Sequence, residues 1–361
     1  MKVGWRGILG FVVTFLLLWW LLQDVDLAEV WREVEGADFG LLLLAVAIAT
    51  GTFLLRALRW KVLLHPIRSD TSLRSRFAAV NIGFMANNLL PARVGEFARA
   101  YALARLEPVP VSGAFASLVV ERFLDGMVIV FLLFVAMASP SFPDEPATGA
   151  LSLPALIQGV TFFLGAVLAG MVLLLLFPRP LVRMVERLAR FLPDAVARLV
   201  VDAMEAFLDG LKVFRSPRLM VLAVLWSLGT WAWQSLAFWV GFLAFGIHVS
   251  YAAALFVNAM VAFAVSVPAA PGFFGTFHAG ASVGLAVYGV PPGPTLAFAI
   301  GFHLGGFIPV TLIGLYYAWR LGISFQEVER SEETVEEAVE SAHPAAAAAE
   351  REDGGGGERR W

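Results

Sequence analysis

The chain of 361 residues contains no cysteine and few charged residues, and both absences narrow what it can be. Without cysteine there are no disulfides and no thiolate metal sites. The five histidines are scattered and show no metal-ligand spacing, so we predict no metal site and no cofactor. No G-x-x-x-x-G-K-[ST] loop is present either, so a nucleotide-driven activity is not expected from this chain alone. The histidines are His65, His248, His278, His303 and His343.

Charged residues make up 15% of the sequence, whereas hydrophobic residues make up 59%. A soluble domain carries more charge and less apolar surface, so this composition indicates an all-α integral membrane protein that crosses the bilayer several times. We expect membrane lipid as its partner and no nucleic acid. The sequence leaves the oligomeric state open.

A segment of the first half is repeated in the second half at a constant spacing. Val80-Asn81, Pro91-Ala92, Gly95 and Phe97 recur 177 positions later as Val257-Asn258, Pro268-Ala269, Gly272 and Phe274. A chance match is the alternative explanation of these identities, because apolar segments are built from few residue types. Paired Gly/Pro-interrupted apolar segments in two halves of a membrane protein are typical of inverted-repeat transporters. The breaks are expected at Pro91, Gly95, Pro268, Pro271, Gly272 and Gly275.

Six apolar runs are long enough to cross a bilayer, and the two repeat copies lie between them. Lys and Arg collect in 56–76 and 179–218, which we place in the cytoplasm, whereas 23–38 and 139–154 are acidic and are placed outside. Each copy must then return to the side it entered from, and the two copies enter from opposite sides. This predicts two re-entrant helical hairpins of inverted orientation, although two full crossings per copy give the same parity. The runs are 8–22, 39–60, 113–138, 155–177, 219–245 and 296–319.

The domain organisation follows from this topology. Residues 1–321 form one membrane domain with repeat cores near 73–107 and 250–290, and 178–218 reads as a cytoplasmic amphipathic segment. Residues 322–361 hold an acidic, low-complexity tail to which we assign no function. We expect the plasma membrane as location, with the N-terminus and the tail in the cytoplasm.

Charged side chains at membrane depth are costly, so those in and after the first break are candidates for function. If a helix starts near Gly95, Glu96 can pair with Arg99, and Glu121 and Asp125 share one face of the next span. Arg93, Arg99 and Arg122 are candidates to bind an anionic headgroup, because guanidinium groups and inward-facing helix N-termini, one near Gly95 and a second at Gly272, suit phosphate. A purely structural ion-pair cluster is the alternative. Asn81, Asn87, Asn88, Asn258, Glu96, Glu121, Asp125, His278 and His303 form the supporting polar set.

Two smaller features have simpler interpretations. Arg56, Arg59 and Trp60 stand at a cytoplasmic helix end, where an interfacial anchor is expected. His278 and His303 are expected to be hydrogen-bonded packing residues, although either could titrate near neutral pH.

Four motifs resemble the flippase-type transmembrane family that includes the membrane domain of bacterial lysylphosphatidylglycerol synthase/flippase. They are R-x-x-R-W at 56–60, N-x-x-P-x-R-x-G-E-x-x-R at 88–99, E-R-x-x-D at 121–125 and P-x-x-P-G-x-x-G at 268–275. The resemblance implies a lipid-handling membrane protein. His278 and His303 depart from it, because the family usually has Glu and Arg there. No synthase domain is recognised after the last span.

We therefore expect a flippase that moves an anionic phospholipid or a lipid-linked intermediate between leaflets. Arg93 and Arg99, aided by Arg122, would attract the phosphate. An intramembrane lipid-modifying enzyme with a carboxylate base is one alternative, although no catalytic motif is found. An ion or small-solute carrier is the other.

Overall fold

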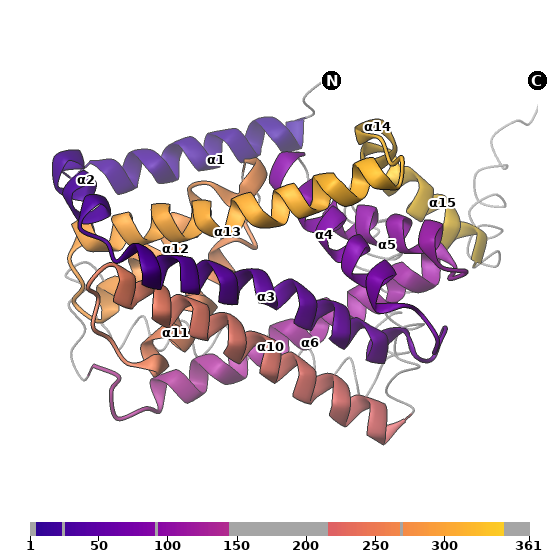
Figure 1. The fold of residues 1–361 in the computed structure, drawn as a ribbon, viewed down its shortest axis with the longest axis horizontal. Coiled ribbons are helices and arrows are strands. Elements are labelled where there is room, and N and C mark those ends of the chain that lie inside the picture. Colours follow the sequence, from indigo (N-terminus) through magenta and orange to yellow (C-terminus); the bar gives the residue numbers. More distant parts are fainter. Residues whose placement is uncertain (1–4, 24–25, 91–92, 144–215, 268–269, 343–361) are drawn as a thin grey trace, which may run out of the picture.

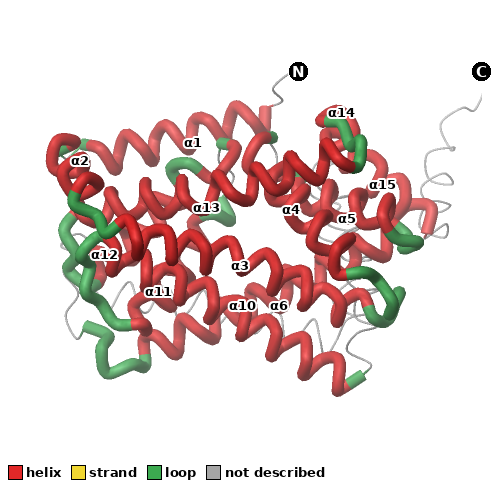
Figure 2. The backbone as a smooth tube through the Cα atoms, in the orientation of Figure 1, coloured by secondary structure: helices red, strands yellow, loops and turns green. Residues whose placement is uncertain are grey.

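The computed structural model describes residues 5–23, 26–90, 93–143, 216–267 and 270–342, and every regular element in these ranges is helical. Figures 1 and 2 show long helices running side by side along the molecule, with shorter helices at both ends. The elements are α1 (Trp5–Leu22), α2 (Leu27–Glu35), α3 (Phe39–Leu64), α4 (Leu73–Leu89), α5 (Gly95–Leu106), α6 (Val111–Met137), α10 (Pro217–Ala244), α11 (Tyr251–Ala264), the 3₁₀ helix η3 (Pro271–Phe273), α12 (Thr276–Val287), α13 (Pro292–Arg320), α14 (Phe325–Glu329) and α15 (Ser331–Ala342).

Three helices are long and apolar enough to cross a membrane, namely α3, α10 and α13, and the bent pair α1 and α2 can add a fourth span. They correspond to the predicted runs 39–60, 219–245, 296–319 and 8–22. Helix α6 has a comparable length of 27 residues, but Glu121, Arg122 and Asp125 interrupt its apolar sequence. The predicted run 155–177 and most of the predicted amphipathic segment 178–218 lie outside the described residues.

Polar residues at the ends of the apolar segments fix where the helices begin. The side chains of Asp38, Ser72 and Ser250 accept hydrogen bonds from backbone N–H groups in the first turns of α3, α4 and α11. Ser216 does the same for α10, which has Pro217 in its first turn. Such caps satisfy donors that have no partner inside the helix.

The repeat copies form two antiparallel helix pairs, α4 with α5 and α11 with α12. Glycines allow the close approach in both. An added Cβ at Gly83 would lie 2.6 Å from the carbonyl oxygen of Gly95 on α5. Added Cβ atoms at Gly280 and Gly284 would lie 2.7 Å and 3.1 Å from the Cα atoms of Val261 and Val257 on α11. The small side of each helix therefore faces its partner.

Both breaks lie beside the middle of α13, a helix of 29 residues. On the first hairpin, Asn88 Nδ2 donates to Thr311 Oγ1 (2.8 Å). On the second, the ring of Phe274 lies 5.8 Å from that of Phe307, one turn away from Thr311. Pro91 and Pro268 themselves lie outside the described residues.

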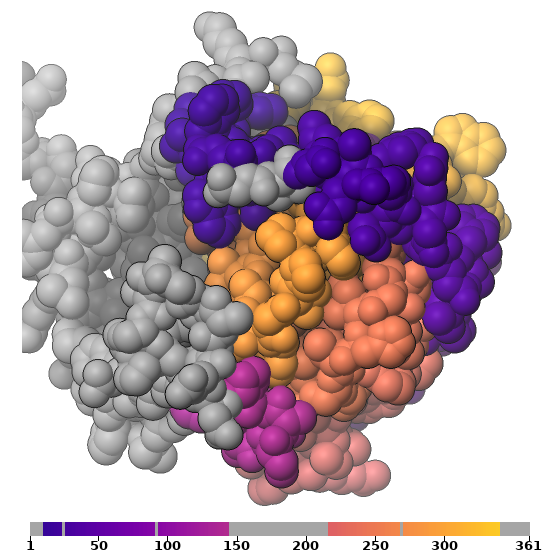
Figure 3. Space-filling model, turned by 90° about the vertical axis from the view of Figure 1, so that its left-hand side faces the viewer, coloured from indigo at the N-terminus to yellow at the C-terminus, as the bar shows by residue number. Residues whose placement is uncertain are grey.

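The two hairpins occupy opposite ends of the molecule. Figure 1 shows α4 and α5 at the end that also holds α14 and α15, whereas α11 and α12 lie at the end that holds α2. The view onto that second end shows atoms of α13, in orange, packed beside those of the second hairpin region and beneath the N-terminal helices (Figure 3). Figure 1 also shows α3 and α13 extending between the two ends.

The two breaks differ in how the following helix starts. Helix α5 begins at Gly95 as predicted, and the Gly95 N–H donates to Asn87 Oδ1 (2.9 Å). Helix α12 begins at Thr276, and the predicted start at Gly272 is wrong. The backbone φ angles of Gly272 and Gly275 are 73° and 84°. This left-handed conformation does not fit an α-helix, and glycine adopts it without strain.

The first part of the acidic tail forms two short helices, α14 and α15, that pack against the first hairpin. Ser324 and Glu327 form a capping box at the start of α14, and the Ser324 backbone N–H, which donates to the carboxylate, holds the pKa of Glu327 below its usual value. Arg105 of α5 forms an ion pair with Glu327 (2.6 Å). Helices α14 and α15 bury three valines against the core, which are Val328, Val335 and Val339.

Replacing Val335 with aspartate is expected to release α15 from this surface. The new carboxylate would be buried without a partner, and a penalty of roughly 2 kcal/mol corresponds to about thirtyfold more of the undocked form. The measurement is the rate of trypsin cleavage after Arg330, followed by mass spectrometry of the purified protein. The exposed Glu337→Gln serves as control and should leave that rate unchanged. Equal cleavage rates in Val335→Asp and wild type would mean that the valines do not hold the tail.

Candidate functional site

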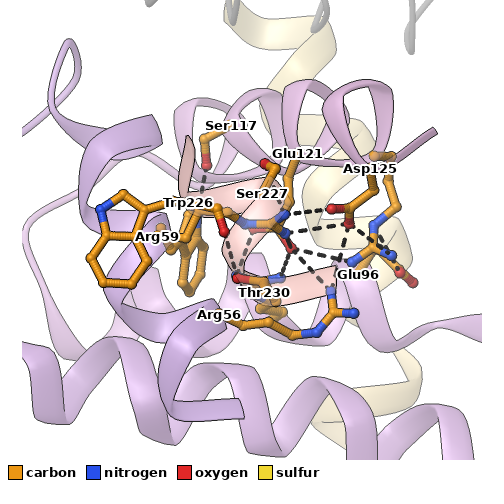
Figure 4. A network of polar contacts seen from close by, with 12 residues as sticks. Arg56, Arg59, Glu96, Ser117, Glu121, Asp125, Trp226, Ser227 and Thr230 are labelled. Atoms are coloured by element: carbon orange, nitrogen blue, oxygen red, sulfur yellow. Dashed lines mark hydrogen bonds and ion pairs between the residues drawn. The ribbon is translucent and has the colours of Figure 1, made fainter. Parts of the chain in front are cut away.

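A buried network of charged side chains joins α3, α5, α6 and α10 inside the bundle (Figure 4). Its centre is formed by Glu121 and Asp125, which lie one turn apart on α6 and are both buried. The prediction that they share one helix face is confirmed. Because each carboxylate is removed from water, its charge requires ionic partners nearby.

Arg99 of α5 is the main partner of Glu121. Its two terminal nitrogens donate to the two carboxylate oxygens at 2.7 and 2.9 Å, and its guanidinium carbon lies 4.0 Å from the ring centre of Trp60. The predicted Glu96–Arg99 pair is therefore wrong. Arg99 faces α6, whereas Glu96 is partly exposed and reaches Arg122 at 3.7 Å.

Arg59 of α3 binds both carboxylates at once. Its Nη1 contacts Asp125 Oδ1, and its Nη2 lies 2.9 Å from Glu121 Oε1. Arg59 and Trp60 are 0% exposed and Arg56 is 5% exposed, so the predicted interfacial anchor is wrong for all three residues. The carboxylates on α6 draw this end of α3 into the protein interior.

Neutral side chains add further hydrogen bonds around the charges. Trp231 Nε1 donates to Asp125 Oδ1 (2.8 Å), and Ser227, also on α10, accepts from Arg59 Nη1 (3.1 Å). On the other side, Trp60 Nε1 donates to Ser117 Oγ (2.8 Å). Sequence reasoning missed Ser117, Ser227 and Trp231. Their only signal is a polar atom within an otherwise apolar helix.

The network holds more positive than negative charge. Arg56, Arg59, Arg99 and Arg122 face Glu96, Glu121 and Asp125, which leaves one unbalanced positive charge among these residues. Three buried guanidinium nitrogens of the network have no hydrogen-bond acceptor within the described part of the chain. These nitrogens are Arg56 Nη1, Arg59 Nε and Arg99 Nε. A buried cluster with spare donors and excess positive charge can accept an anion.

Arg93 lies at the junction of the two breaks and contacts the second break. Its Nη1 donates to the carbonyl oxygen of Ser266 (3.0 Å), and its guanidinium carbon lies 5.1 Å from the ring centre of Phe273. Arg93 and Phe273 both have positive φ, at 58° and 61°. The structure therefore uses Arg93 to link the two hairpins, and it brings Arg99 and Arg122 together around Glu121.

The remaining polar residues occupy separate places. Asn81 Nδ2 donates to the Phe77 carbonyl (2.8 Å) and Asn258 Nδ2 to Ser235 Oγ (2.9 Å), and the carbonyl oxygens of both amides are buried without a donor among the described residues. These two asparagines hold equivalent positions in the repeat. The buried amide oxygens leave each hairpin with an unpaired acceptor next to its neighbouring helices.

His278 and His303 lie together near the second break, although 25 positions separate them in the sequence. Their ring centres are 5.2 Å apart, and the rings of Phe274, Phe277 and Phe307 surround them. Nδ1 of each histidine is buried and finds no hydrogen-bond partner in the described ranges. Both are packing residues as predicted, and His303 also has the predicted hydrogen bond, with the backbone of Gly272.

The sequence profile of the lysylphosphatidylglycerol synthase TM region matches residues 7–314, which include every residue of the buried network. The chain belongs to this family. Within it, the chain is 24% identical over 84% of its length to the UPF0104 membrane protein MJ1595 of Methanocaldococcus jannaschii, of which the match covers 91%. It is 26% identical over 88% of its length to a UPF0104 membrane protein of Methanothermobacter thermautotrophicus, 95% covered. A third relative, glycosyltransferase AglD of Haloferax volcanii, is 28% identical over 81% of this chain, and the match covers 51% of that protein.

Proposed function

We propose that this family member moves an anionic phospholipid or a lipid-linked intermediate between the leaflets of the plasma membrane. The observation that carries the proposal is the buried part of the network, in which three guanidinium groups outnumber two carboxylates inside an apolar bundle; these are Arg56, Arg59 and Arg99 against Glu121 and Asp125. An unbalanced charge that is held away from water is energetically costly, so its presence in the bundle indicates a functional role. A lipid phosphate supplies the missing negative charge.

The arrangement of the hairpins supports transport through re-entrant segments. Helix α4 contains 17 residues, and helix α11 contains 14 residues. At the helical rise these lengths correspond to about 25 Å and about 21 Å, less than the hydrocarbon core of roughly 30 Å. Both breaks reach the middle of α13, and the hairpins come from opposite ends of the bundle. An inverted pair of half-spanning hairpins offers access from each side of the membrane in turn.

A lipid-modifying transferase is the second candidate, because one relative is named a glycosyltransferase. General-base catalysis needs a carboxylate that can accept a proton. Glu121 and Asp125 are instead held by two or more arginines each, and Glu96 lies beside Arg122. The oxygens of these carboxylates already contact guanidinium groups, which favours a role in binding over one in proton transfer. The relative's name is also compatible with a lipid-linked sugar as the transported molecule.

Leaflet exchange in proteoliposomes tests the proposal. We expect the wild-type protein to exchange a fluorescent anionic lipid faster than protein-free liposomes, and Arg93→Ala to lower the rate about tenfold or more because the contact between the two breaks is lost. The measurement is quenching of outer-leaflet fluorescence. Arg68→Gln, which alters an exposed ion pair with Asp70, is the control. Chemically altered lipid without exchange would favour the transferase, and neither outcome would favour the solute carrier.

A further inference from the structure

Arg56 is the least satisfied charge of the buried network. The nearest carboxylate oxygens to its Nη1 are Asp125 Oδ2 at 3.6 Å and Glu121 Oε1 at 3.9 Å, and Nη1 makes no hydrogen bond within the described residues. Its other terminal nitrogen donates to the neutral Gln234 Oε1, at 3.4 Å, and to no other acceptor among the described residues. Arg59, one turn further along α3, is by contrast bonded to both carboxylates. A buried guanidinium with an unused donor needs an acceptor, and the described part of the chain does not provide one.

Two aromatic rings hold Arg56 in place without neutralising it. Its guanidinium carbon lies 5.3 Å from the ring centre of Phe84 on α4 and 5.7 Å from that of Trp231 on α10. Cation–π contacts of this kind position a planar guanidinium and leave its edge free for hydrogen bonds. The free Nη1 is therefore fixed on the side of Asp125.

Arg122 lies near the same carboxylate oxygen and is more exposed than Arg56. Its Nη1 lies 3.8 Å from Asp125 Oδ2, and its side chain is 43% exposed. Both Nη1 atoms lie close to that one oxygen, so they are no more than about 8 Å apart, a distance that one phosphate spans with two hydrogen bonds of about 2.8 Å. Arg122 is therefore the more exposed of the two guanidinium groups, with 43% side-chain exposure against 6% for Arg56.

We propose that Arg56 and Arg122 together bind the phosphate group of the transported lipid. This assignment rests on the proposed function and deepens it, because it names the two residues and the chemical group they recognise. The phosphate accepts from Arg56 Nη1, which is otherwise unpartnered in the described structure, and neutralises the excess positive charge. Arg99 is not part of this site, since both of its terminal nitrogens are occupied by Glu121. Arg93 belongs to the contact between the hairpins.

Binding of short-chain lipids to the full-length protein in detergent tests the assignment. Dihexanoyl phosphatidic acid carries a phosphomonoester, dihexanoyl phosphatidylglycerol a phosphodiester, and dihexanoylglycerol no phosphate. We expect the wild-type protein to bind the first two and not the third, with the tighter of the two identifying the phosphate class. Arg56→Gln should weaken binding about tenfold or more, because a charge-assisted pair is lost. Arg68→Gln, a substitution of a partly exposed arginine outside the network, should bind like wild type.

Thermal unfolding without lipid separates a binding role from a structural one. If the role of Arg56 is to bind a ligand, its charge is unbalanced in the lipid-free protein. Arg56→Gln then removes this unbalanced buried charge, and the Tm of the lipid-free protein stays the same or rises. A lower Tm in Arg56→Gln would show that Arg56 stabilises the empty protein and would overturn the proposal.

Three further results overturn the assignment. They are unchanged lipid binding by Arg56→Gln, equally tight binding of dihexanoylglycerol, and binding of inorganic phosphate as tight as that of the phospholipids, which would indicate a soluble anion. The proposed function fails separately. If lipid binding depends on Arg56 but the reconstituted wild-type protein exchanges no lipid, the phosphate site is supported and the proposed transport function is wrong.

Discussion

Replacing Glu121 with glutamine is expected to cost roughly 3–5 kcal/mol of stability, which is the loss typical of removing one partner from a buried ion pair. Glu121 faces Arg59, Arg99 and Arg122, at 2.9, 2.7 and 3.2 Å. The neutral amide keeps the shape of the carboxylate but leaves these positive charges with Asp125 as the only fully buried acid among the described residues of the network. The measurement is thermal unfolding of the purified protein in detergent, compared with wild type.

Glu96→Gln provides the matched control, because it removes the same charge from the edge of the same network. Glu96 is partly exposed and lies 3.7 Å from Arg122. An ion pair at the solvent-exposed edge contributes little, so the loss of Glu96 should change stability by less than about 1 kcal/mol. Losses of equal size in the two variants would show that burial does not govern the energetics of the network. An unchanged Tm in Glu121→Gln would show that the carboxylate does not stabilise the bundle.

The sequence predicts the helices well because helix formation in a membrane depends on properties that sequence records directly. Apolar length predicts the long helices α3, α10 and α13, and the helical period places Glu121 and Asp125 on one face. The break before Gly95 also follows from local signals, a proline and a glycine within an apolar segment. The inverted placement of the hairpins in the bilayer stays a prediction, based on charge bias and repeat symmetry.

Partners that are distant in the sequence could not be predicted in this way. Arg59 meets Asp125, 66 positions later, and Ser227, 168 positions later. Basic and aromatic residues at a helix end normally indicate an interfacial anchor. At Arg59 and Trp60 this local rule fails, because the carboxylates on α6 supply charge partners inside the bundle. Only the packing of α3 against α6 and α10 reveals this.

The repeat also illustrates what sequence identity leaves out. Gly95 and Gly272 are equivalent positions, and both lie where a hairpin turns back. Gly95 starts a helix, whereas Gly272 adopts a left-handed conformation inside a 3₁₀ turn, and α12 begins only after Gly275. Gly272 allows the chain to remain non-helical as far as Gly275. The same residue at corresponding positions therefore gives two different helix starts.

Replacing Gly83 with alanine is expected to destabilise the first hairpin by about 1–3 kcal/mol, the usual cost of overpacking. The new methyl would lie 2.6 Å from the carbonyl oxygen of Gly95 and 2.9 Å from Cβ of Arg99. Both belong to the rigid helix α5, so α5 itself must shift. Because Arg99 is part of that helix, its pairing with Glu121 should weaken as well. Thermal unfolding measures the first effect, and reconstituted leaflet exchange measures the second.

Gly229→Ala is the matched control, since Gly229 lies within helix α10 and an added Cβ there meets no atom within 4 Å. Alanine favours the helix over glycine by about 0.5–1 kcal/mol, so this variant should be slightly more stable than wild type. The same substitution is thus expected to act with opposite signs at the two positions. A stabilising effect at Gly83 would mean that α4 and α5 do not pack closely, and that the position of Arg99 does not depend on their contact.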